Sequence, residues 1–213
     1  ISSLVLVNPD NPTGNYIPYK DCLRLAQWCE ERDIMFILDE SFIDFSCEHP
    51  TFICNEVLEQ FGCLVIIKSI SKSYGVPGLR LGILASSNAE LMTNIRRSVS
   101  IWNINSFAEF FLQILGKYER CYQQAMEDFR IERKRFQEEL SAIKFLRVIP
   151  SEANYFLCEV LNPHTPRELA AQLLKQHNIL IKDCSSKCNG AYIRIAVRDT
   201  HDNNKLVEAL RLI

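Results

Sequence analysis

The sequence predicts an α/β fold with two parts, and three observations support this prediction. Strand-like runs that are apolar throughout alternate with helical segments over the first 86 residues, as in a mixed, mostly parallel sheet with helices on both faces. A long charged helix with a thin apolar stripe comes next. Short strands and helices then follow in a different order, which predicts a small C-terminal α+β domain.

The larger domain contains four predicted strands. They cover residues 3–7, 34–40, 63–69 and 81–86, and each is a short apolar run bounded by turn-forming or polar residues. Between the first two strands, residues 19–33 have the apolar spacing of a helix. Further along the chain, Asn88 and Asn105 are predicted to cap the amino ends of two helices, although Asn105 could instead face an active site. The aromatic residues Phe107, Phe110 and Phe111 are expected to pack into a helical core.

The sequence pattern of the second half of the chain predicts a linking helix and a small domain. We assign residues 1–120 to the larger domain, 121–144 to the linking helix and 145–213 to the small domain. In the small domain the strands are expected in 145–150, 153–160, 179–184 and 191–198. One helix is expected to begin after the cap Thr165 with Pro166 in its first position, and a last helix near Asp202.

Composition excludes several classes of function. The chain has 213 residues, of which 47% are hydrophobic and 23% are charged, as in a globular protein with a core. A formal net charge of -2 gives no basic field for nucleic acid or an anionic membrane, and no apolar run approaches the roughly 20 residues of a membrane-spanning helix.

The cysteines indicate the compartment. There are nine, an odd number, and most lie in apolar surroundings; Cys22 and Cys29 are seven apart on one helix face. This usage predicts free thiols in a reducing, cytoplasmic compartment. The CSSKC segment at 184–188 has no second cysteine pair or nearby histidine, so no metal site is expected.

Polar side chains follow the ends of three predicted strands. Asn8 and Asn11 follow the first, Asp39 and Glu40 the second, and Ser69, Ser71 and Lys72 the third. Ligands of open α/β sheets bind beyond the carboxyl ends of strands. Each feature alone also has a plain explanation, since NPTG makes a good turn, a carboxylate after a strand often caps a helix, and a loop lysine is usually solvated. Their order and spacing together favour a ligand.

Pyridoxal phosphate has the matching chemical needs. Its aldehyde requires a lysine amine, and its pyridine nitrogen requires a carboxylate that keeps the ring an electron sink. Its phosphate requires hydroxyls, backbone amides and a fixed cation, for which the planar fork of an arginine such as Arg80 is suited. No G-x-G-x-x-G follows a strand, which argues against a nicotinamide enzyme of the Rossmann type.

The segments NPDNPTG, LDESFIDF and SISKSYGVPGLRLG, in this order, resemble the class I/II pyridoxal-phosphate-dependent aminotransferases. The resemblance implies the aspartate-aminotransferase-like fold, fold type I. It is strongest to the subgroup of threonine-phosphate decarboxylase and histidinol-phosphate aminotransferase, through YGVPGLRLG, SIWNINSFA, ANYFL, ILIKDC and YIRIAVR.

The resemblance also implies roles for individual residues. Lys72 would form the Schiff base with the cofactor and then move the proton of the substrate. Asn11 would donate to the phenolic oxygen, Asp39 would pair with the pyridinium nitrogen, and Arg194 would clamp the substrate carboxylate. The cofactor phosphate would be held by Ser69, Ser71 and Arg80.

Two positions depart from the family pattern. Many of the aminotransferases have a tyrosine where this chain has Phe42, so the cofactor would lose one hydrogen-bond donor. The decarboxylase has an arginine where this chain has Lys182, which could meet a phosphate or carboxylate or could be a solvated lysine at a strand end. Asn154 could reach the substrate or serve as a structural amide, and Arg198 is either a further anion contact or a surface residue.

Three functional hypotheses follow. The first is transamination of an amino acid or phosphorylated amino compound through Lys72, and the second is decarboxylation of the threonine-phosphate type. The third is a non-catalytic fragment or dimerisation module of a longer protein, because family members are longer and the amino-terminal part of their fold is missing here. The resemblance implies a homodimer, and we expect weak or no catalysis from this segment alone.

Overall fold

The computed structural model describes residues 1–48 and 50–213 and divides them into two compact units. The first unit contains residues 1–10 and 16–126, and the second contains residues 11–15 and 127–213. The division falls inside helix α5 (Glu119–Ser141), where the sequence predicts one long helix. The short segment 11–15, from the NPTG motif, is therefore part of the second unit.

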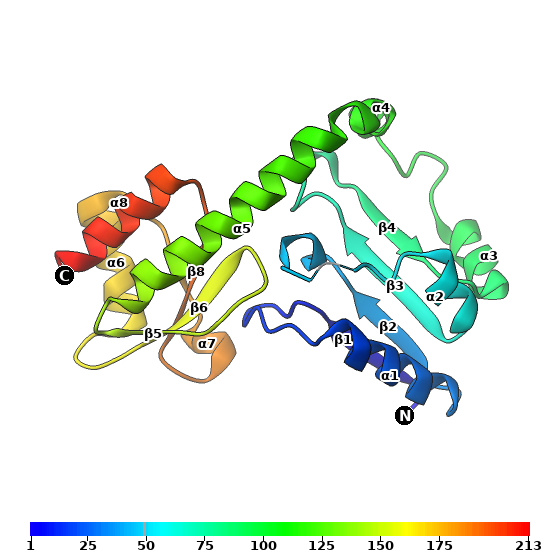
Figure 1. The fold of residues 1–213 in the computed structure, drawn as a ribbon, viewed down its shortest axis with the longest axis horizontal. Helices are drawn as coiled ribbons and strands as arrows, with labels where there is room; N and C mark the ends of the chain where they lie inside the picture. The colour runs from blue at the N-terminus through cyan, green and yellow to red at the C-terminus, as the bar shows by residue number, and fades with distance from the viewer. Residues whose placement is uncertain (49) are drawn as a thin grey trace. The chain divides into compact units, whose positions relative to one another are not determined.

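The first unit is built on a four-stranded sheet in the order β1-β2-β3-β4 (Figure 1). Its strands are β1 (Ser3–Val7), β2 (Met35–Asp39), β3 (Leu64–Ser69) and β4 (Gly82–Ala85). The first three run parallel and β4 pairs antiparallel with β3, so the predicted mixed, mostly parallel sheet is confirmed. The carboxyl ends of β1, β2 and β3 consequently lie at one edge of the sheet.

Helices α1 (Tyr19–Glu30) and α2 (Asn55–Gln60) pack against one face of this sheet. The first unit also contains α3 (Ala89–Ser98) and α4 (Ser106–Leu115), with short 3-10 turns η1 (Ile43–Phe45), η2 (Pro77–Leu79) and η3 (Gly116–Tyr118). A core forms where Phe36, Leu38 and Ile66 of the sheet meet Cys22 and Cys29 of α1, all buried. The two cysteines thus act as small apolar core residues.

On the opposite face of the sheet, several apolar side chains are exposed to solvent. Val5, Met35 and Ile67 are exposed there, because strand residues two apart point to the same side.

Helix α4 corrects one expectation. Phe107 and Phe110 are exposed, and only Phe111 packs partly against a small cluster with Ile70 and Leu81. The prediction that the three aromatic residues pack into a core is therefore wrong for the first two. They occur at helical spacing, but Ala108 is the residue that α4 buries.

The second unit is a four-stranded antiparallel sheet in the order β5-β6-β8-β7. Its strands are β5 (Leu146–Val148), β6 (Tyr155–Val160), β7 (Lys182–Asp183) and β8 (Tyr192–Ala196), and its helices are α6 (Pro166–His177), α7 (Ser185–Cys188) and α8 (Thr200–Arg211) beside the carboxyl-terminal part of α5. Phe136 of α5, Phe156 and Ile195 of the sheet, and Leu173 of α6 share one buried core.

The ends of the helices follow the predicted chemistry closely. The side chains of Asn88, Asn105 and Thr165 each accept a hydrogen bond from a backbone amide in the first turn of their helix. Helix α8 begins two residues before the expected position, because Asp199 caps it. The strand expected over 179–184 is reduced to β7, since the amide of Ile179 instead bonds the Leu173 carbonyl and ends α6.

Glu132 of α5 ties that helix to α8. Its carboxylate accepts hydrogen bonds from Arg135, Thr200 and Asn203, at 2.7–2.9 Å. These donors, above all Arg135, hold the pKa of the Glu132 carboxyl down to about 2.

Replacing Glu132 with glutamine is expected to lower the free energy of unfolding at pH 7 by about 1 kcal/mol. The folded state depresses the pKa, so the stabilisation is present above the ordinary value of 4.5 and is lost as the pH falls towards 2. Urea denaturation at pH 7 and at pH 3 measures this, with Glu138→Gln on the exposed side of α5 as the control. An undiminished difference between wild type and Glu132→Gln at pH 3 would contradict the prediction.

Candidate functional site

Lys72 lies three residues beyond β3, in a turn of the first unit. The side chain is exposed, and its ammonium lies over the Phe42 ring, 4.0 Å from the ring centroid. Partial burial of the Lys72 side chain lowers the pKa of its ammonium. The nearby negative charge of Asp39 raises that pKa, but the effect of burial is the larger one. A lowered pKa increases the fraction of neutral amine, which is the nucleophilic form.

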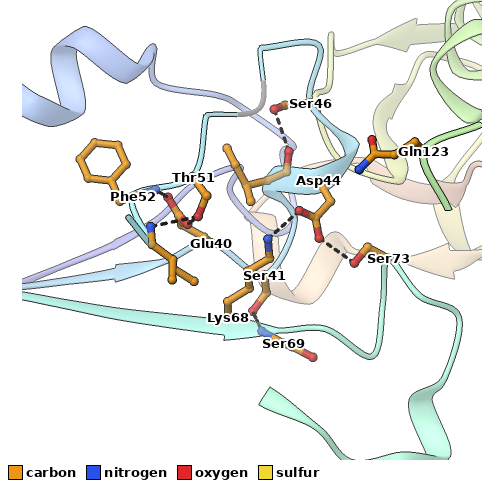
Figure 2. A network of polar contacts seen from close by, with 12 residues as sticks. Glu40, Ser41, Asp44, Ser46, Thr51, Phe52, Lys68, Ser69, Ser73 and Gln123 are labelled. Atoms are coloured by element: carbon orange, nitrogen blue, oxygen red, sulfur yellow. Dashed lines mark hydrogen bonds and ion pairs between the residues drawn. The ribbon is translucent and has the colours of Figure 1, made fainter. Parts of the chain in front are cut away.

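The two carboxylates that follow β2 separate into different roles. Asp39 is half-buried at the carboxyl end of the strand, and its Oδ1 accepts a 2.8 Å hydrogen bond from the amide of Ser41. Glu40 points into the protein, where it accepts hydrogen bonds from the Thr51 hydroxyl at 2.6 Å and the Phe52 amide at 2.8 Å (Figure 2). Burial raises the pKa of Glu40. Asp39 is therefore the carboxylate available beside Lys72.

The three predicted phosphate ligands differ in what they offer. Ser69 is half-buried at the end of β3, and its amide donates to the Ser41 hydroxyl at 3.0 Å. Ser71 is buried and donates its hydroxyl hydrogen to the Leu81 carbonyl at 3.2 Å, so in this arrangement only its oxygen lone pairs remain. Arg80 is exposed and has a left-handed backbone (φ 57°). One N–H of its guanidinium donates a hydrogen bond to the Pro77 carbonyl. Its other guanidinium donors can meet an anion.

Asn11 and Arg194 form a contact in the second unit. The Arg194 guanidinium donates to Oδ1 of Asn11 at 2.7 Å, and it lies over the ring of Tyr155 at 5.0 Å. A guanidinium only donates, so the amide oxygen of Asn11 faces it and the amide NH₂ remains a donor for another group. The Tyr155 ring restricts the movement of the guanidinium, whose planar fork has the geometry to pair with a carboxylate.

A second cation lies beside Arg194 in the sheet. Lys182 of β7 is directly opposite Arg194 of β8 in the antiparallel register, and it is exposed. Like charges directly opposite each other on a sheet are destabilising, and a bound anion would relieve that repulsion. Asn154, which immediately precedes β6, accepts a hydrogen bond from the Val197 amide through its carbonyl. Arg198 pairs with Asp202 on the surface, as the surface interpretation expects.

A polar cluster beneath the Lys72 turn was not predicted from the sequence. Asp44 of η1 bonds Lys68 through one carboxylate oxygen and Ser73 through the other (Figure 2). Asp44 lies in the LDESFIDF motif and Ser73 follows Lys72 directly, but no local pattern in the sequence links the two positions. The partners of the Asp44 carboxylate, Lys68 and Ser73, are visible only in the folded structure.

Comparison with known proteins decides the family. The model described as "Aminotransferase class I and II" matches residues 1–211, nearly the whole chain. The chain belongs to the class I and II aminotransferase family. The members of this family are pyridoxal-phosphate-dependent enzymes acting on amino-acid-type small molecules, and the resemblance noted in the sequence is confirmed.

The relatives include both enzymes of the subgroup that the motifs indicate. A threonine-phosphate decarboxylase of Salmonella typhimurium is 33% identical to this chain. The alignment covers 99% of this chain and 57% of the decarboxylase. A CMP-5'-(3-aminopropyl)phosphonate synthase of Streptomyces rubellomurinus is 35% identical over 99% of the chain and 34% of its own length. The histidinol-phosphate aminotransferase structure from Clostridium acetobutylicum aligns with a TM-score of 0.90 at 30% identity, covering 99% of this chain and 63% of that one.

The chain therefore spans between about a third and under two thirds of the length of these relatives. No helix among the described residues is long and apolar enough to cross a membrane.

Proposed function

We propose that the chain is part of a pyridoxal-phosphate-dependent enzyme that transfers the amino group of an amino acid or phosphorylated amino compound. The observation that carries this proposal is Lys72, an exposed lysine with a lowered pKa that lies beyond a strand end within electrostatic reach of Asp39. A lysine amine and a carboxylate are the two groups that this cofactor needs at its aldehyde and its pyridine nitrogen.

The donor set fits the cofactor. The first unit offers the Lys72 amine, the Asp39 carboxylate and the remaining donors of Arg80, whereas Ser71 fits less well while its hydroxyl hydrogen is bound to Leu81. The second unit offers the free amide NH₂ of Asn11 as a neutral donor. When bound, pyridoxal phosphate supplies an electron sink that stabilises the carbanion left by a broken bond at the substrate α-carbon.

In this proposal each residue has a defined task. Lys72 would hold the cofactor through its amine and would carry the α-proton of the substrate. Asp39 keeps the ring nitrogen protonated, Asn11 donates to the phenolic oxygen, and Arg194 binds the substrate carboxylate. Ser69, Ser71 and Arg80 are assigned to the phosphate, and Lys182 and Asn154 to the substrate.

Arg194→Lys is expected to raise KM for the amino substrate about 10- to 100-fold while changing kcat less. Lysine keeps the charge but loses the fork that binds a carboxylate through two hydrogen bonds, as well as the stacking on Tyr155. Steady-state kinetics measure the effect, with Arg198→Lys near the same strand end as the control. An equal KM in wild type and Arg194→Lys would remove Arg194 from substrate binding.

Decarboxylation of a phosphorylated amino acid is the second candidate. The pairing of Lys182 with Arg194 on adjacent strands supports it, because two cations suit a substrate that carries both a carboxylate and a phosphate. The 33% identity with a threonine-phosphate decarboxylase supports it as well.

The test uses the complete protein with added pyridoxal phosphate. A visible absorption band that borohydride bleaches would support cofactor binding through a lysine. Threonine phosphate and histidinol phosphate are then supplied separately, and carbon dioxide release is measured against amino transfer to a keto acid. Release of carbon dioxide alone would replace transamination by decarboxylation. A colourless protein would instead favour a non-catalytic module, the third hypothesis.

Two further assignments belong to the proposal. We infer a homodimer, which family membership supports and sedimentation analysis can test. We also infer a cytoplasmic location, supported by the odd number of cysteines, nine, and by the apolar surroundings of most of them.

A further inference from the structure

The turn that carries Lys72 is fixed on both sides of that residue. Ser71 and Ser73 are both buried, with 4% and 7% of their surface exposed, whereas Lys72 between them is exposed. Ser71 bonds the Leu81 carbonyl and Ser73 bonds Asp44. Because both neighbours are bonded to the protein interior, the peptide units on either side of Lys72 are held and its side chain is directed outward.

Asp44 is the centre of this arrangement. Its Oδ2 accepts the Ser73 hydroxyl at 2.7 Å, and its Oδ1 accepts the Lys68 ammonium at 2.6 Å (Figure 2). The side chains of Lys68 and Asp44 are only 11% and 19% exposed. An ion pair with this little solvent around it is screened weakly, so Lys68 holds the carboxylate in one orientation towards Ser73.

The η1 segment also contacts Lys72 directly. Phe42 immediately precedes η1, two residues before Asp44, and its ring lies under the Lys72 ammonium at 4.0 Å. One short segment therefore contacts the Lys72 side chain through Phe42 and the Lys72 backbone through Asp44 and Ser73. Both contacts depend on the same backbone, so a shift of η1 would move the amine.

We propose that Asp44 is a positioning residue for Lys72 and acts through the hydroxyl of Ser73. This inference rests on the proposed function, in which Lys72 is the residue that carries the cofactor. The ion pair with Lys68 fixes Asp44, Asp44 fixes Ser73, and Ser73 fixes the backbone from which the reactive amine projects. Displacements of about 1 Å at a catalytic group can cost about 100-fold in rate.

The first variant is Ser73→Ala in the complete protein with bound pyridoxal phosphate, because it leaves the Lys68–Asp44 pair in place. We expect kcat to fall about 10-fold with KM changed less than about 2-fold, since the amine is misplaced while substrate binding is kept. The pH at which the visible band of the bound cofactor titrates is also expected to move by about 0.5 unit or more. Ser73→Thr, which keeps the hydroxyl, is expected to restore both values.

The matched control is Ser86→Ala. The Ser86 hydroxyl donates to the backbone carbonyl of Leu64 at 2.7 Å, at the far end of β3 from Lys72, so the variant removes a serine hydroxyl hydrogen bond away from the Asp44 cluster. It is expected to leave kcat and the titration unchanged. Asp44→Asn and the double variant Asp44→Asn/Ser73→Ala complete a cycle, in which the double variant is expected to lose little more than the single ones.

The outcomes separate the inference from the function on which it rests. A wild-type protein without a visible band would overturn the proposed function and, with it, this inference. A normal wild-type band together with a Ser73→Ala variant that keeps the wild-type titration and kcat would overturn the positioning role alone. Strictly additive losses in the cycle would also overturn it, because they would mean that Asp44 and Ser73 act independently. Circular dichroism melting of every variant identifies loss of fold, and if Ser73→Ala is unfolded the same criteria apply to Asp44→Asn.

Discussion

Lys72→Ala is expected to abolish the visible absorption of bound cofactor and to lower turnover about 1,000-fold or more. The alanine has no amine for the covalent bond with the cofactor and none for the proton transfer, and either loss alone is large. Absorption spectra of the purified protein with added pyridoxal phosphate and single-turnover kinetics measure the two effects.

Lys72→Arg is the informative control. Arginine keeps a positive charge at this position beside the Phe42 ring, but its guanidinium stays protonated and offers no primary amine for a Schiff base. It should therefore behave like Lys72→Ala in the spectrum. A visible, borohydride-sensitive band that persists in Lys72→Ala would move the covalent role to another lysine.

Leu173→Ala is expected to lower the free energy of unfolding by about 2–5 kcal/mol. Leu173 is fully buried in the core of the second unit, and alanine there leaves a cavity as well as lost apolar contact. Such a loss is a large fraction of the 5–15 kcal/mol that stabilises a typical domain. Urea denaturation with the slope of the transition unchanged measures the difference.

The matched control for this core substitution is Leu180→Ala, seven residues further along the chain. Leu180 is 80% exposed, so the same chemical change should alter the stability by less than about 0.5 kcal/mol. A small effect at Leu173, similar to that at Leu180, would mean that the core collapses around the missing side chain.

Local chemistry explains why much of the fold is predictable. The wholly apolar runs that become β2 and β3 are typical of strands in a largely parallel sheet. The side chains of Asn88 and Thr165 accept from the first-turn amides of their helices whatever the rest of the chain does. Expectations failed where tertiary structure decides. The aromatic residues Phe107 and Phe110 have helical spacing, but spacing shows only that they share a face and not that another element covers it.

The candidate site divides in the same way. Lys72, Asp39 and Arg80 could be proposed from the sequence because strand ends and turns place them in order along the chain. The contact of Asn11 with Arg194 joins residues 183 positions apart, and no local pattern contains that separation. The cluster around Asp44 was missed because a carboxylate between Ile43 and Phe45 gives no sign of its partner 29 residues away.

The left-handed backbone of Arg80 has a consequence for how this sequence can change. For a residue with a Cβ, the backbone conformation at φ 57° costs about 1 kcal/mol of conformational free energy. Glycine would adopt the same conformation without that strain. Selection for stability alone would therefore favour glycine at position 80, at the expense of a guanidinium that can meet an anion. At position 80, therefore, the residue that relieves backbone strain differs from the residue that offers a guanidinium to an anion.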